Sequence, residues 1–251
     1  MKTCLIKQPQ GIGDIFFTQK IAYHFRHLGY RVIWPVVPVY KSIKEYMTNF
    51  EYPCIEDDFE HKDLYESCGK DKIFRWKEGS PDEIIVVPTN HLSTPEEIPV
   101  MFRKFALVGL DYSDWADWFN FKRNTEKENR LYYDVLGLKD NEEYIFVNRN
   151  IGTPPHDFSR WDVPVDSKIG KQIDSSFENG FTLFDWCKVL ENASEFHVLE
   201  TSITYLIEKI NTKASVYNMF SRNLHNDFSE YKEIYKNKSW NWRKFNHRRI
   251  I

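Results

Sequence analysis

Short apolar runs alternate with segments of helical spacing along most of the chain. The runs are typical of buried strands and lie at residues 3–7, 31–37, 84–87, 144–148, 196–199 and 215–219. Apolar residues three or four positions apart predict helices over residues 17–28, 41–47, 95–107, 126–136, 181–193 and 202–210. Strands that alternate with helices in this way indicate an α/β protein with parallel sheets and helices on both faces.

The alternation restarts near residue 140, which indicates two domains rather than one. We expect a Rossmann-like domain over residues 1–138 and a second over residues 139–251, with parallel sheets that face one another across a cleft. Two local signals mark helix ends within them. Gly29 follows the first predicted helix at a C-cap position, and Thr182 precedes a later helix at an N-cap position.

The composition excludes several classes of protein. Of 251 residues, 41% are hydrophobic and 16% aromatic, so packed cores are expected and a disordered chain is excluded. No apolar run reaches the ~18 residues of a membrane span, and no apolar leader opens the sequence, so we expect a soluble, cytoplasmic protein. The four cysteines form no CxxC pair and have no histidine at zinc-finger spacing, and we expect no bound metal.

Positive charge gathers at the end of the chain, although the net charge is −3. Residues 231–251 carry seven Lys or Arg and one acid, together with Trp240, Trp242 and Phe245. We favour a terminal helix whose aromatic side chains pack and whose charges are solvated. The alternative is an arm for an anionic partner. We do not expect this partner to be a nucleic acid. A membrane surface that residues 236–249 contact from outside stays open.

The loop after the first predicted strand contains Gly11, Gly13 and Asp14. In a parallel sheet this loop lies at the carboxyl end of a strand, where ligands bind, and glycines let a ligand approach the backbone. It is not a dinucleotide fingerprint, because Phe16 stands at the third glycine position and no acid closes the second strand. On these residues alone, two interpretations stay open: a ligand site, or a turn in which Asp14 only caps the helix.

Three segments resemble a known family. Residues 4–32 (CLIKQPQGIGDIFFTQKIAYHFRHLGYRV) resemble the opening of the heptosyltransferase-type glycosyltransferases, which have the GT-B fold. Residues 181–218 are similar to the donor side of that family, with Glu200-Thr201-Ser202 where the family has Asp-Thr-Gly. Residues 148–164 (NRNIGTPPHDFSRWDVP) are similar to its segment of a basic residue followed by Trp and Pro.

The resemblance implies an inverting hexosyl- or heptosyl-type transferase that needs no metal or cofactor. It would move a sugar from a nucleotide sugar to a glycan or glycolipid acceptor. Asp14 would accept the proton of the acceptor hydroxyl, with Gly11 and Gly13 on the acceptor side. The donor side would comprise Asn148, Arg149, Arg160, Glu200, Thr201 and Ser202.

Within that donor side, each residue type suits one part of a nucleotide sugar. Arg160 and Arg149 would offset the charge of the donor diphosphate. Glu200 would hold ribose or sugar hydroxyls, and Thr201 and Ser202 would bind phosphate at a helix N-terminus. Two alternatives stay open: a binding module for glycans or nucleotides without catalysis, and another Rossmann-type enzyme acting on nucleotide sugars.

Overall fold

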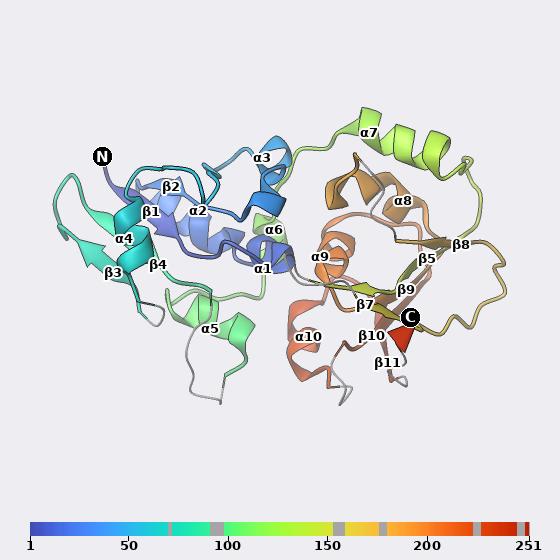
Figure 1. The fold of residues 1–251 in the computed structure, drawn as a ribbon. Helices are drawn as coiled ribbons and strands as arrows, with labels where there is room; N and C mark the ends of the chain where they lie inside the picture. The colour runs from blue at the N-terminus through green and yellow to red at the C-terminus, as the bar shows by residue number, and fades with distance from the viewer. Residues whose placement is uncertain are drawn as a thin grey trace. The chain divides into compact units, whose positions relative to one another are not determined.

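The computed structural model describes residues 1–69, 72–90, 98–152, 159–175, 180–222, 227–244 and 249–250. The chain divides into two units, Met1–Lys122 and Arg123–Ile251, each with its own sheet (Figure 1). In both, the central strands run parallel, as the alternation of strands and helices predicts.

The sheet of the first unit has the strand order β2 (Arg31–Ile33), β1 (Thr3–Ile6), β4 (Ile84–Val87) and β3 (Phe74–Trp76). The first three strands are parallel, and β1 and β4 are buried along their whole length. β3 runs antiparallel to β4, and all three of its residues are exposed. The sequence did not predict β3, because a strand without buried residues has no apolar pattern.

The first unit has helices in the three predicted regions, with shifted ends, and further helices that the sequence pattern did not predict. They are α1 (Ile12–Phe17), α2 (Gln19–His27), α3 (Ile43–Tyr46), α4 (Lys62–Ser67), α5 (Val100–Ala106) and α6 (Trp115–Trp118), with a 3₁₀ turn at Pro38–Tyr40. Gly29 follows α2 with a φ of +84°, which confirms its predicted role. The strand predicted over residues 31–37 is wrong beyond Ile33, since Pro35 has no N–H to donate to a neighbouring strand.

Aromatic side chains pack α1 against the later helices of the first unit. Phe16 stacks on Phe119 with ring centroids 4.3 Å apart, and Phe17 meets Phe105 of α5 edge to face at 4.9 Å. All four rings are fully buried. This packing places α5 next to the loop between β1 and α1.

The sheet of the second unit has the order β11 (Trp240–Arg243), β10 (Val216–Phe220), β9 (Glu195–Leu199), β5 (Ile145–Asn148) and β8 (Gln172–Asp174), with each neighbouring pair parallel (Figure 1). A small antiparallel sheet joins β6 (Asn150–Ile151), β7 (Ser159–Trp161) and β12 (Arg249–Ile250). Because β5, β8, β9 and β10 are parallel, their carboxyl ends lie at one edge of the larger sheet.

The helical segments of the second unit are α7 (Thr125–Asn129), a π-helical turn (Arg130–Val135), a 3₁₀ turn (Leu183–Trp186), α8 (Cys187–Asn192), α9 (Ser202–Lys209) and α10 (Ser229–Ile234). Thr182 begins the 3₁₀ turn in a capping box with Asp185, which confirms its role as N-cap.

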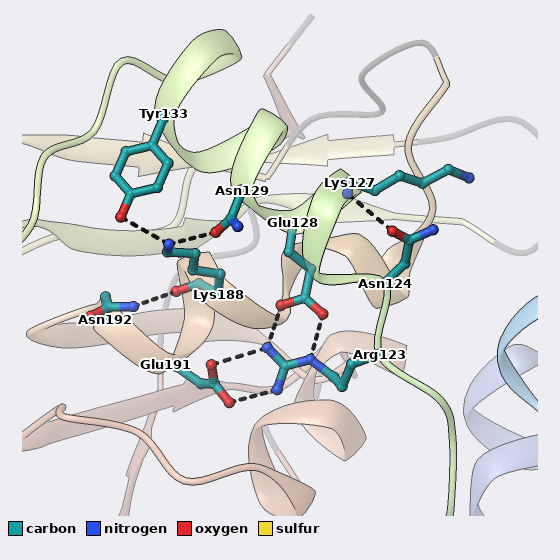
Figure 2. Close-up of polar contacts among 9 residues, drawn as sticks. All are labelled: Arg123, Asn124, Lys127, Glu128, Asn129, Tyr133, Lys188, Glu191 and Asn192. Atoms are coloured by element: carbon teal, nitrogen blue, oxygen red, sulfur yellow. Dashed lines mark hydrogen bonds and ion pairs between the residues drawn. The ribbon is translucent and has the colours of Figure 1, made fainter.

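Residues 123–138 group with the second unit, whose first residue is Arg123, because side chains of this segment are anchored to α8. Figure 2 shows the Arg123 guanidinium between the Glu128 and Glu191 carboxylates. It donates to Glu191 at 2.7 and 3.0 Å and also pairs with Glu128. Lys188 of α8 donates to Asn129 at 2.6 Å and to the Tyr133 hydroxyl at 2.9 Å. The sequence pattern places the helix over residues 126–136 correctly but does not show which unit it packs against.

The terminal helix predicted for residues 231–251 is wrong. The helix α10 ends at Ile234, and Trp240–Arg243 is the strand β11, which pairs in parallel with β10. Trp240 is buried and its indole N–H donates to Glu208, while the backbone N–H of Asn237 donates to the same carboxylate at 2.7 Å. Trp240 and Trp242 thus pack against other aromatic rings as expected, but on a strand at the sheet edge. Phe245 and Arg248 lie outside the described residues, and membrane contact through residues 236–249 stays a prediction.

The buried carboxyl of Glu208 makes the stability of the folded protein fall as the pH rises. Burial raises the pKa of the Glu208 carboxyl, and hydrogen bonds from Trp240 and Asn237 partly offset the rise. A carboxyl whose pKa is higher in the folded state ionises first in the unfolded state, so its contribution to stability is lost as the pH rises above the ordinary value. We expect the melting temperature of Glu208→Gln, relative to wild type, to rise between about pH 4 and pH 7. Thermal melts across that range test this, with the exposed Glu233→Gln as control. The prediction would be contradicted if the melting temperatures of wild type and Glu208→Gln changed with pH in the same way.

Candidate functional site

The loop between β1 and α1 presents Asp14 on the first turn of a helix. Gly11 is the N-cap residue with a φ of +78°, a conformation that favours glycine, and a Cβ at this position would collide with the Asp14 carboxylate. Gly13 lies inside α1, not in the turn before it. Gly11, not Asp14, occupies the N-cap position, and Asp14 lies in the first turn of α1.

The Asp14 carboxylate is paired instead with Lys104, which projects from α5. The Lys104 ammonium also donates to Gln8 Oε1 at 2.9 Å, and Gln8 Nε2 in turn donates to the carbonyl of Gln10 at 2.6 Å. The Lys104 side chain is 3% exposed, whereas that of Asp14 is 32% exposed. The loop therefore offers an accessible carboxylate held by a buried cation.

Lys104 gives no signal in the sequence pattern. A lysine next to apolar residues on a predicted helix is normally read as a side chain that extends into water. Its partners lie 90 or more positions away, so no local spacing reveals the pair.

Asn148 connects three strand ends at the carboxyl edge of the second sheet. Its Nδ2 donates to Thr201 Oγ1 at 2.9 Å, just after β9. Its Oδ1 accepts from Ser175 Oγ at 2.6 Å, just after β8. Asn148 itself is the last residue of β5 and is buried. The amide therefore links the end of β8 to the segment that carries Thr201 and Ser202.

Arg149 and Arg160 converge on one oxygen of Asp174. Arg149 Nη1 donates to Asp174 Oδ2 at 2.7 Å, and Arg160 Nη2 donates to the same oxygen. Arg149 also donates to Gln172 Oε1 at 3.2 Å. The structure thus brings together the two cations that the sequence singled out. It adds Asp174, which the sequence analysis missed because β8 is a short strand with a single buried residue.

Glu200 is buried at the end of β9 and pairs with Arg222, whose Nε lies 2.9 Å from Glu200 Oε2. The charge of Glu200 is the main cause that raises the pKa of Arg222. Thr201 is the N-cap residue of α9, and Ser202 is the first residue of that helix. Thr201 makes no side-chain capping hydrogen bond to α9, and its hydroxyl accepts from Asn148 instead. Glu200 holds Arg222, a further cation near the carboxyl edge that the sequence analysis did not identify.

Two further observations on the described residues concern metal binding and membrane spans. Across the described ranges, no group of three or more His, Cys, Asp or Glu side chains is arranged to hold a metal ion. In the same ranges, no helix has the length and apolar character needed to cross a membrane. The expected independence of metal and cofactor stays a prediction.

Comparison with known proteins identifies a solved structure with a similar fold. No protein-family model matches the chain, and no curated protein matches it. The structure is similar to the crystal structure of the glycosyl transferase family 9 from Veillonella parvula DSM 2008, with a TM-score of 0.50 and 10% sequence identity. The alignment covers 88% of this chain and 80% of that chain. At this identity the likeness concerns the fold alone. The chain has an α/β, GT-B-like fold with two Rossmann-like units.

Proposed function

We propose that the protein is a glycosyltransferase that moves a sugar from a nucleotide sugar to a glycan or glycolipid acceptor, with inversion and without a metal. The observation that carries the proposal is the convergence of Arg149 and Arg160 at the carboxyl edge of a parallel sheet. In open α/β sheets this edge is where ligands bind. The fold similarity to a glycosyl transferase supports the same class of chemistry.

On the donor side, the second unit supplies positive charge for a leaving diphosphate. When the bond between the anomeric carbon and the diphosphate breaks, negative charge grows on the departing phosphate oxygen. Arg149 and Arg160 would offset this charge, and Arg222 adds a third cation near the same edge. Thr201 and Ser202 would bind phosphate at the N-terminus of α9, in the position that Asn148 fixes.

On the acceptor side, Asp14 would act as the base. The acceptor oxygen forms a bond to the anomeric carbon, and its proton passes to the Asp14 carboxylate. One Asp14 oxygen is engaged by Lys104, and the side chain stays one-third exposed, so the carboxylate remains accessible to an acceptor hydroxyl. The absence of a side chain at Gly11 lets that carboxylate lie against the loop backbone, since a Cβ there would collide with it.

A transfer assay over a panel of nucleotide sugars, with soluble and lipid-linked glycans as acceptors, tests the proposal. We expect release of nucleoside diphosphate together with a lengthened glycan. Nucleotide binding without turnover for every pair would instead favour the non-catalytic binding module. A nicotinamide or other cofactor that copurifies with the protein would favour another Rossmann-type enzyme.

Arg160→Ala tests the donor site directly. Loss of a charge-assisted contact worth about 1.5–3 kcal/mol should weaken nucleoside diphosphate binding roughly tenfold to a hundredfold. The Arg160 side chain is 44% exposed, so the melting temperature of the unliganded protein should not change. Isothermal titration calorimetry measures the affinity, with the exposed Lys168→Ala as a control for loss of one positive charge on the same unit. Equal affinities for wild type and Arg160→Ala would remove Arg160 from the donor site.

A further inference from the structure

Asp174 is an unusual component of an anion site, because it carries the same charge as the proposed ligand. Its Oδ2 accepts hydrogen bonds from both Arg149 and Arg160. Its Oδ1 is buried and has no hydrogen-bond partner among the described residues. The carboxylate therefore neutralises one of two positive charges while half of its own hydrogen-bonding capacity stays unused.

The two arginines depend on Asp174 to different degrees. Arg149 is 14% exposed and has a second acceptor in Gln172 Oε1, so it keeps a partner without Asp174. Arg160 is 44% exposed, and its guanidinium reaches Asp174 from the strand β7. An incoming anion can therefore replace the carboxylate on Arg160 without removing the support of Arg149.

We infer that Asp174 is a displaceable counterion, which occupies the arginine pair in the unliganded protein and leaves it when a diphosphate group binds. Phosphate oxygens accept the same guanidinium N–H groups that Asp174 accepts. The carboxylate both competes for those groups and repels the ligand, so it weakens the binding of every anion, and most of all that of the most highly charged. The inference rests on the donor-site placement in the proposed function, but it concerns binding and not turnover.

Asp174→Asn separates this role from a purely supporting one. The amide keeps the shape of the carboxylate and removes its charge, which changes the net charge of the three side chains from +1 to +2. We expect inorganic pyrophosphate to bind about tenfold more tightly to Asp174→Asn than to wild type at low salt, since one like charge close to the ligand is gone. Inorganic phosphate should gain less. Asp174→Ala, which removes the competing acceptor as well, should also bind pyrophosphate more tightly than wild type.

Calorimetric titration of the full chain with pyrophosphate and with phosphate provides the measurement. Asp166→Asn is the matched control, because it removes one exposed carboxylate from the same unit and should leave the pyrophosphate affinity within about twofold. Unchanged or weaker pyrophosphate binding by both Asp174 variants, or no measurable binding by any of the proteins, would overturn the inference. Tighter binding without sugar transfer from any donor would leave the counterion role supported and overturn only the proposed function.

Discussion

Replacement of Asp14 by Asn is expected to lower turnover by a factor of about 10²–10⁴, which is the usual contribution of a general base. The amide cannot take the proton of the acceptor hydroxyl, whereas the residues that would hold the donor lie in the second unit and are unaltered. Initial rates at saturating donor measure turnover, and calorimetry checks that the affinity for the donor persists.

The pair with Lys104 requires a second variant in this experiment. From the sequence, Asn should cap the helix as well as Asp, so the stability should not change. In the structure Asp14 balances an ammonium that is 3% exposed, and removal of one partner of such a pair costs about 3–5 kcal/mol. We therefore expect Asp14→Asn to lower the melting temperature. The double variant Asp14→Asn/Lys104→Met, which leaves no charge behind, should recover much of the stability.

The double variant also makes the catalytic test decisive. If Asp14 is the base, this protein folds and stays at least a hundredfold slower than wild type, whereas Lys104→Met alone keeps more of the activity. Wild-type turnover by the double variant would show that Asp14 has only a structural role and would leave the proposed mechanism without a base.

Arg123→Met is expected to lower the free energy of unfolding by about 3 kcal/mol, near the lower end of the range for a broken buried ion pair. The Glu128 carboxylate, which is 2% exposed, would lose its cation (Figure 2). Glu191 would lose its cation as well, but it is one-third exposed and therefore better hydrated. Chemical denaturation measures the change.

Two comparisons identify the cause of that destabilisation. The exposed neighbour Lys122→Met should change the stability by no more than about 0.5 kcal/mol. Adding Glu128→Gln to Arg123→Met removes the uncompensated charge, so the double variant should be more stable than Arg123→Met alone. Equal stabilities of these two variants would place the cost in lost packing of the arginine side chain instead.

The sequence by itself determined the elements that bury a regular apolar pattern. The strands β1, β4, β5, β9 and β10 and the helix α9 lie where the spacing of apolar residues predicts them. The N-cap at Thr182 and the positive φ at Gly29 follow from local rules that involve neighbouring residues alone. The sequence also indicated Arg149 and Arg160 as cations of one site, although it did not reveal the carboxylate that they share.

Only the tertiary structure decided which side chains share a partner. Lys104 lies 90 residues from Asp14, and Asp174 lies 25 residues from Arg149, so neither pair has a spacing that a helix or strand period would reveal. The short or exposed strands β3 and β8 and the terminal strand β11 have no strong pattern of their own and form by pairing with a neighbouring strand. The periodicity of apolar residues indicates which face of a helix or strand is buried. Ion pairs and strand pairing depend on residues far apart in the sequence, which folding brings together.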